Sequence, residues 1–213
     1  ASNTAVGTFS LDANTTGAQG TAMGYGALSA NTTADDNTAV GYLALQDNTT
    51  GANNVAVGSG TLKENTTASG NVAMGYAAGN LNTTGPYNTY IGYEAGKSNL
   101  TSDQNSFVGY GSGRLVTGAS NTALGAFSLY DATTGIANVA IGTAALYETT
   151  TGSNNTAMGR DALRNNTTAS NSTALGKDSL RANTTGAANT AVGYAALTDN
   201  TTGTNNVAVG ENA

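Results

Sequence analysis

A glycine that recurs at a fixed interval constrains this chain more than any other feature. The marker glycines are Gly7, Gly24, Gly41, Gly58, Gly75, Gly92, Gly109, Gly125, Gly142, Gly159, Gly176, Gly193 and Gly210, and they lie 17 residues apart except for one interval of 16. The repeating unit reads N-T-A-V-G-Y-x-A-L-x-x-N-T-T-G-x-x. So short a period is typical of a solenoid with one coil per repeat. We therefore predict a single tandem-repeat solenoid over residues 1–213.

The composition supports thin coils in place of globular domains. Among 213 residues there are 36 Thr, 29 Gly and 27 Asn, but only 3 Phe and no Trp or Cys. These residues cannot fill the thick core that a domain of this length requires. So polar a composition would also suit a disordered chain, and the strict period argues against that alternative.

Strand alternation predicts which side chains face the inside of each coil. The position before the marker glycine is always aliphatic, and the position two residues earlier is Thr, Val or, once, Ser. Alternate side chains of a strand share a face, so we predict a core ladder at the aliphatic position and an outward Ala between the two. The predicted ladder is Val6, Met23, Val40, Val57, Met74, Ile91, Val108, Leu124, Ile141, Met158, Leu175, Val192 and Val209.

A second apolar step follows three and four places after the marker glycine, for example at Ala27 and Leu28. Together with the turn-prone N-T-T-G segment, it predicts two short strands per coil. The expected fold is thus all-β, a parallel β-solenoid or β-roll of about twelve coils. Stacked at the strand spacing, they would make a rod of roughly 60 Å, with Asn amides bonded along the axis.

One region departs from the pattern. Between residues 75 and 125 the Leu of the second step becomes Gly79, Gly96 and Gly113, and the Ala before the aliphatic position becomes Tyr90 and Phe107. Either volume is exchanged between the two faces to preserve packing, or this region holds a bend or a specialised binding patch.

The residue types argue against catalysis. The chain has no His and no Cys, which removes the usual metal ligands, the histidine base and the thiol nucleophile. We therefore predict no enzyme activity, no catalytic or metal site and no cofactor. The net charge of −6 makes nucleic acid an unfavourable partner, and the sequence has no hydrophobic span for membrane insertion.

Two columns of residues are candidate contact or modification sites. A tyrosine column follows the marker glycine at Tyr25, Tyr42, Tyr76, Tyr93, Tyr110 and Tyr194; its rings could stack on sugars or could instead cap the thin core. An asparagine column forms formal glycosylation sequons at Asn14, Asn31, Asn48, Asn65, Asn82, Asn99, Asn166, Asn183 and Asn200. The alternative for these Asn residues is a bare turn ladder.

A dense charge patch stands near the C-terminal end. Arg160, Asp161 and Arg164 lie one period before Lys177, Asp178 and Arg181. The patch is interpreted as Arg–Asp pairing between coils or plain solvation, or else as a docking surface for an anionic partner.

The phrases N-V-A-V-G at residues 54–58 and N-V-A-I-G at residues 138–142 resemble the S-V-A-I-G head repeats of trimeric autotransporter adhesins. The complete unit is more similar to the repeats of phage tail-fibre-like and bacterial surface proteins. The resemblance covers the whole chain. It implies left-handed parallel β-rolls, assembled as trimers that bind host surface molecules.

These observations favour a structural or adhesive fibre shaft of a surface appendage or phage tail fibre, which contacts carbohydrate along its face. The expected partners are other copies of the chain, as a trimer or an end-to-end filament, and a surface glycan; the expected location is extracellular, on a cell or virion surface. The alternatives are an ice-binding solenoid, because the faces are rich in Thr and Ala, and a passive extracellular filament or matrix protein. Since the repeats begin and end inside a coil, we also expect an excerpt of a longer tract or stacked subunits.

Overall fold

The computed structural model describes residues 2–213 and is an all-β, parallel β-solenoid. The coils contain the strands β1 (Thr4–Val6), β2 (Thr21–Met23), β3 (Thr38–Val40), β4 (Val55–Val57), β5 (Val72–Met74), β6 (Thr89–Ile91), β7 (Ser106–Val108), β8 (Thr122–Leu124), β9 (Val139–Ile141), β10 (Thr156–Met158), β11 (Thr173–Leu175), β12 (Thr190–Val192) and β13 (Val207–Val209). No helix occurs in residues 2–213, so none of these residues forms a membrane-spanning helix. The predicted fold class is confirmed.

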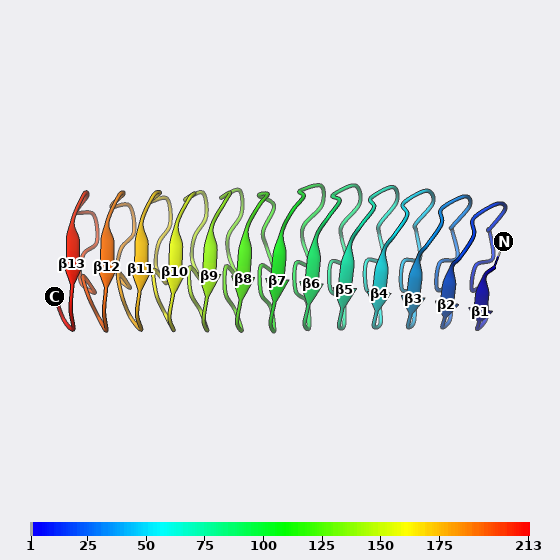
Figure 1. The fold of residues 1–213 in the computed structure, drawn as a ribbon, viewed down its shortest axis with the longest axis horizontal. Helices are drawn as coiled ribbons and strands as arrows, with labels where there is room; N and C mark the ends of the chain where they lie inside the picture. The colour runs from blue at the N-terminus through cyan, green and yellow to red at the C-terminus, as the bar shows by residue number, and fades with distance from the viewer. Residues whose placement is uncertain (1) are drawn as a thin grey trace. The chain divides into compact units, whose positions relative to one another are not determined.

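The coils form two compact units, one ending at Asn105 and the other beginning at Ser106. The N-terminal unit contains β1 to β6 and the C-terminal unit contains β7 to β13. Within each unit, successive strands lie side by side and pair in parallel (Figure 1). The register places equivalent residues next to each other, as in Ala39↔Ala56 and Ala140↔Ala157. The division falls inside the irregular region predicted from the sequence.

Each coil has one strand, so the prediction of two strands per coil is wrong. The second apolar step is a turn, because its Leu has a left-handed backbone with φ between 47° and 52° in all nine coils that carry Leu at this position. Extended strands need negative φ. Backbone bonds still join this turn to the next coil, as from the Leu28 N–H to the Ala44 carbonyl at 3.1 Å.

The core lies on the opposite side of the strands from the predicted one. The central Ala of strands β2 to β5 and β8 to β12 is buried, whereas the flanking positions are half-buried or exposed in every strand. Val6 is 56% exposed and Leu124 is 48% exposed. The predicted core ladder therefore points outward, and the Ala that we expected on the outside faces the core. The interior is filled from the opposite wall by the turn leucines, such as Leu28 and Leu146, which are fully buried.

The irregular region preserves this packing by exchanging volume. Tyr90 and Phe107 replace the central Ala of their strands and are fully buried. A Cβ at Gly79 or Gly96 would collide with the Tyr90 ring, and a Cβ at Gly113 would collide with the Phe107 ring. Each ring therefore occupies the space that a turn Leu fills in other coils. Volume is exchanged within one shared core, so the packing is preserved, but the predicted exchange between two faces is wrong.

Buried asparagines provide the polar part of each core, as predicted. The side-chain amide of Asn48 donates to Asn31 Oδ1 at 3.0 Å and to the Gly51 carbonyl at 2.9 Å. Asn65 continues this ladder by donating to Asn48 Oδ1 at 2.8 Å. In a second column, Asn37 Oδ1 accepts from the Asn54 N–H at 2.9 Å. These bonds satisfy turn groups that are removed from water.

The ladder is interrupted at Tyr90, where a stability test can be made. The Asn99 amide donates to the Tyr90 hydroxyl instead of to Asn82 Oδ1, which has no partner. Burial raises the pKa of Tyr90 above its ordinary value of 10.0. Because the folded state holds the phenol protonated, its contribution to stability is complete below pH 10 and is lost as the pH rises above that value.

When the pH is raised from about 9 to about 11, the free energy of unfolding should fall for both proteins. We expect this fall to be smaller for Tyr90→Phe than for the wild type, by roughly 1 kcal/mol. At neutral pH the variant is less stable by about 1–2 kcal/mol, because the Asn99 amide loses its acceptor. Urea denaturation followed by circular dichroism measures both effects. Tyr25→Phe, which removes an exposed phenol, is the control, and an identical alkaline loss in both variants contradicts the prediction.

Candidate functional site

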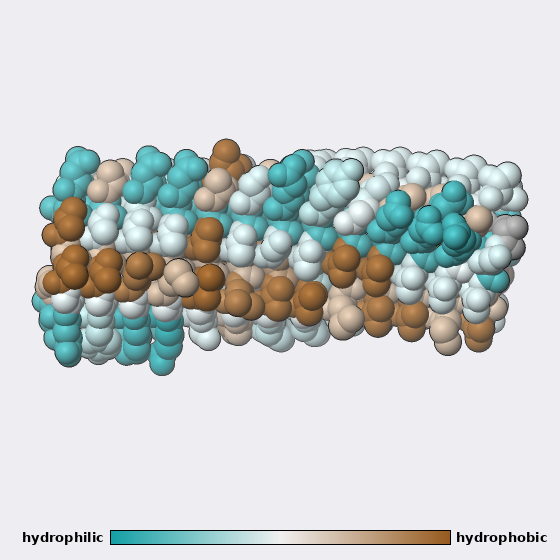
Figure 2. All heavy atoms as spheres, in the orientation of Figure 1, coloured by the Kyte–Doolittle hydropathy of each residue, from teal (hydrophilic) through white to brown (hydrophobic). Residues whose placement is uncertain are grey.

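Two columns of outward side chains form the most regular surface of the protein, which we call the sheet face. The aliphatic column is the set predicted as the core ladder, one position before each marker glycine. The threonine-rich column stands two positions earlier and consists of Thr4, Thr21, Thr38, Val55, Val72, Thr89, Ser106, Thr122, Val139, Thr156, Thr173, Thr190 and Val207. In each unit the sheet face carries no charged side chain. Figure 2 is viewed onto the strands and shows apolar atoms along them.

The aliphatic column is conspicuous for its exposure. Met74 is 49% exposed and Val209 is 70% exposed. The three Met residues of the chain, Met23, Met74 and Met158, all lie in this column. Since single exposed apolar residues are ordinary but contiguous rows are not, the column marks a surface suited to an interaction.

The tyrosine column is on the surface, and each of its rings is partly covered by the coil. Its six rings are 45–56% exposed. Tyr25 stacks on Tyr42 at 5.6 Å between ring centroids, and Tyr76 stacks on Tyr93 at 5.1 Å. Because the stacked faces cover one another, mainly ring edges are presented along the column. Sugar binding by these tyrosines stays a prediction.

Burial contradicts glycosylation of the asparagine column. Seven of the nine candidates are buried, namely Asn31, Asn48, Asn65, Asn82, Asn99, Asn166 and Asn183. Asn14 and Asn200 are half-buried, and their amide nitrogens donate to the carbonyls of Gly17 and Gly203. A glycan must be attached to this nitrogen, so a modified Asn could not keep the ladder. The alternative of a bare turn ladder is confirmed for the buried positions.

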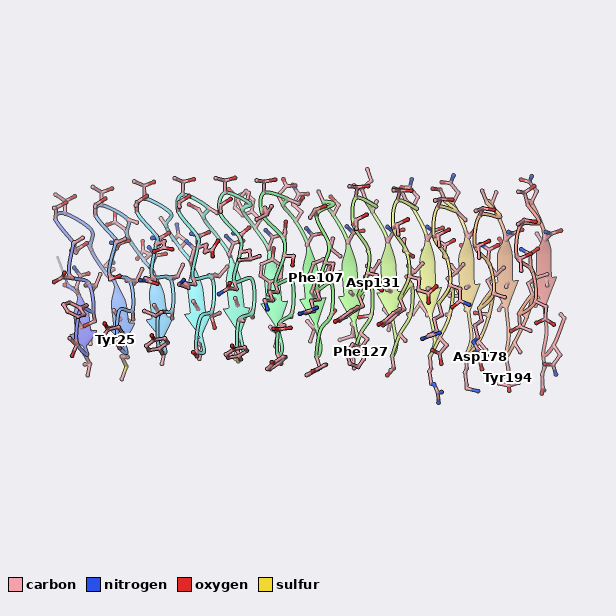
Figure 3. All side chains as sticks on the ribbon, turned by 180° about the vertical axis from the view of Figure 1, so that it is seen from behind. Tyr25, Phe107, Phe127, Asp131, Asp178 and Tyr194 are labelled. Carbon is pink, nitrogen blue, oxygen red and sulfur yellow. The ribbon has the colours of Figure 1, made fainter. Side chains whose placement is uncertain are left out.

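The charge patch lies in the C-terminal unit, and its ion pairs are local. Asp161 contacts Arg160 at 2.9 Å and Arg164 at 3.3 Å, while Asp178 contacts Lys177 at 2.8 Å. Each carboxylate pairs within its own coil, so the predicted pairing between coils is wrong. The Asp178 hydrogen bond raises the pKa of Lys177. Phe127, Asp178 and Tyr194 lie along one edge of this unit (Figure 3).

Aromatic side chains adjoin the charge patch, and the sequence analysis did not associate them with it. Tyr130 and Tyr147 stack at 5.2 Å, and the Arg164 guanidinium lies 5.3 Å from the Tyr147 centroid. Lys177 Nζ lies 4.9 Å from the Tyr194 centroid. The period could have predicted this proximity, because one position of the repeat is occupied in successive coils by Tyr130, Tyr147, Arg164 and Arg181.

Among residues 2–213, no group of three or more acidic side chains is placed to hold a metal ion. Asp35, which precedes Asp36 in the sequence, accepts a hydrogen bond from the Ala18 N–H at 2.7 Å and so links two coils. Within residues 2–213, the candidate contact surfaces of this β-solenoid are the sheet face, the tyrosine column and the charge patch.

The chain matches no protein-family model, no curated protein and no solved structure.

Proposed function

We propose that this protein is a structural, adhesive fibre shaft of an extracellular surface appendage or phage tail fibre, and that its sheet face binds other copies of the chain. The observation that supports this proposal is the exposed aliphatic column. It repeats once per coil in both units and carries no charge. Burying such a row in an interface would contribute about 25 cal/mol per Å² of apolar surface removed from water.

The period of the column favours a second copy as the occupant. A partner that meets every rung in the same way must repeat at the same axial spacing, about 4.8 Å for parallel strands. Another copy of the solenoid has that spacing. The flexible, polarizable Met side chains at three rungs also suit an apolar partner with an adaptable surface.

The proposal is tested by sedimentation velocity on the whole chain over a range of concentrations. We expect a wild-type oligomer, and a monomer for the double variant Leu124→Asp/Met158→Asp, because two charges would be buried in the interface. Both positions are 43–48% exposed in the single chain, so the variant should stay folded. Thr151→Asp/Thr185→Asp, at two exposed positions off the sheet face, is the charge-matched control and should still associate. A monomeric wild type at all concentrations would overturn the proposal.

Ice binding is the second candidate, because the threonine-rich column places a hydroxyl and a methyl group beside the aliphatic column at regular intervals. Eight of its thirteen positions are Thr. The aliphatic column is less suited to a lattice, since Val, Met, Ile and Leu differ in size and Met is flexible. Thermal hysteresis separates the two functions. Hysteresis that persists in Thr151→Asp but not in Thr156→Asp would favour ice binding.

A further inference from the structure

A groove of about 730 Å³ opens beside the charge patch of the C-terminal unit. Its lining residues are Phe127, Thr143, Ala144, Tyr147, Arg160, Asp161, Arg164 and Arg181. None of these residues belongs to the sheet face, so what the groove binds is independent of the proposed self-association.

The groove exists because one coil has small side chains where its neighbours have large ones. Phe127, Ala144 and Asp161 take the same position in three successive coils, two residues after the marker glycine. Thr143 and Ala144 therefore form a low floor between an aromatic ring and a charged pair. The coils on either side of this floor are two strand spacings apart, about 10 Å. This width suits one ring-sized ligand group.

The groove is positively charged within an acidic chain. Four of the seven basic residues, Arg160, Arg164, Lys177 and Arg181, lie in two successive coils together with Asp161 and Asp178. The charged residues that line the groove are Arg160, Arg164, Arg181 and Asp161, which sum to +2, against −6 for the chain. Acidic side chains also adjoin the groove, since burial and the nearby carboxylates of Asp131 and Glu148 raise the pKa of Tyr147.

The arginines keep donors available for a ligand. A guanidinium has five N–H donors. Arg160 donates its Nε to Asp161 at 2.9 Å, and the Arg181 Nε is 4.0 Å from Asp178, beyond hydrogen-bonding distance. The side chains of Arg160 and Arg181 are 67% and 53% exposed. The groove therefore presents two guanidinium groups that can bind carboxylate or sulfate oxygens.

Aromatic rings form the other wall of the groove and are held in place by their neighbours. Phe127 packs edge-on against Tyr130 at 5.5 Å, and Tyr130 stacks on Tyr147 at 5.2 Å. Fixed ring surfaces beside hydrogen-bond donors suit a ligand that has one apolar face and polar substituents at its rim. A sugar ring has this character.

We propose that this groove binds an acidic sugar residue of a glycan, one that carries a carboxylate or a sulfate group. Arg160 and Arg181 bind the oxyanion, Phe127 and the uncovered edge of Tyr147 contact the apolar face of the sugar, and Ala144 leaves the space that the sugar occupies. Nucleic acid is disfavoured, because a long phosphate backbone would extend beyond two coils onto an acidic surface.

Isothermal titration calorimetry with three oligosaccharides tests the proposal. The probes are a sulfated heparin tetrasaccharide, a tetragalacturonate that carries carboxylates only, and neutral maltotetraose. We expect binding of at least one acidic probe, weakened by added salt, and no binding of maltotetraose. A preference between the two acidic probes identifies the oxyanion. Absence of binding to both, or equal binding of maltotetraose, would overturn the proposal.

Two variants and a control locate the binding. Arg160→Gln/Arg181→Gln should weaken the acidic probe at least about tenfold. Ala144→Leu keeps every charge but fills the floor, and should weaken binding as much. Leu43 shows that Leu is accepted at this position of a coil, since its φ of 54° matches the 55° of Ala144.

Lys63→Gln is the control for the loss of a basic side chain, because Lys63 takes the same position in its coil as Arg164 and Arg181 but belongs to the N-terminal unit and does not line the groove. We expect this variant to bind within about twofold of wild type. If Lys63→Gln weakens binding as much as the double Arg variant, or Ala144→Leu binds like wild type, the acidic probe is attracted by overall charge and the groove is not the site. Sedimentation of the same variants reports separately on self-association.

Discussion

Replacing Ala140 with Asp is expected to unfold the C-terminal unit around β9, whereas replacing the adjacent Ile141 with Asp is expected to be tolerated. Ala140 is fully buried, and it pairs with Ala123 on one side and Ala157 on the other. A carboxylate there has no room, no counter-charge and no water. We expect a loss of several kcal/mol in the free energy of unfolding. In the single chain Ile141 points toward solvent and is only partly buried, so its variant should lose no more than about 1 kcal/mol at concentrations where both proteins are monomeric.

Thermal and urea denaturation of the two variants, followed by circular dichroism, measures this difference. The substituted residues are neighbours in one strand and each variant gains one Asp, so net charge is matched. The loss of strand propensity is larger for Ile141→Asp, which opposes the expected order. A melting temperature for Ala140→Asp equal to that of Ile141→Asp would contradict the assignment of the core. A melting temperature for Ile141→Asp below that of Ala140→Asp would show that the aliphatic position faces inward, as the sequence analysis predicted.

The sequence determined the period and the fold class but not which side of the strand is buried. Alternation separates the two faces without labelling them, and the larger aliphatic residues are ordinarily the buried ones. Here the coil is so thin that each turn Leu reaches across to the opposite strand, which leaves space for Ala only. The irregular region contained the missing information. Where Leu becomes Gly96, Ala becomes Tyr90, and residues that exchange volume must share the same space.

The left-handed turn at the second apolar step could not be predicted from the sequence, for a different reason. A left-handed backbone is uncommon for Leu and costs of order 1 kcal/mol, so an Ala-Leu step predicts an extended segment. Burial of the Leu side chain, worth about 1.5–3 kcal/mol, outweighs this cost. Gly79 and Gly113 have φ of 58° and 59° at the same position, and glycine is the residue that such a conformation favours.

The charge patch could be predicted from the sequence, but the groove beside it could not. Its charges are close in the sequence, whereas its hollow depends on Ala144 lying between Phe127 and Asp161, each one coil away. These three residues are seen to be neighbours only when the repeats are aligned by their marker glycines. The sugar contacts predicted on the tyrosine column and those proposed for the groove are therefore different hypotheses with different residues.

Replacing the marker glycine Gly41 with Ala is expected to destabilise the N-terminal unit strongly, although the substitution adds only a methyl group. All thirteen marker glycines have φ between 125° and 140°, a region that residues with a Cβ essentially avoid. This backbone strain alone costs about 1–3 kcal/mol. A Cβ at Gly41 would also collide with the carbonyl oxygen of Gly58 in the next coil. Because Gly58 is held in the same stack, the collision cannot be relieved by moving a flexible side chain.

We therefore expect Gly41→Ala to lower the free energy of unfolding by several kcal/mol, measured by urea denaturation. Gly20→Ala is the matched control. Gly20 has no left-handed φ, and the nearest atom to its added Cβ is the Asn3 side-chain oxygen at 3.3 Å. Its variant should stay within about 1 kcal/mol of wild type, since Ala also restricts the unfolded chain. In a solenoid each coil is stabilised by its neighbours, so a Gly41→Ala defect should also separate the unfolding of the coils on either side. A single, unshifted transition would show that the glycine stack does not set the spacing of the coils.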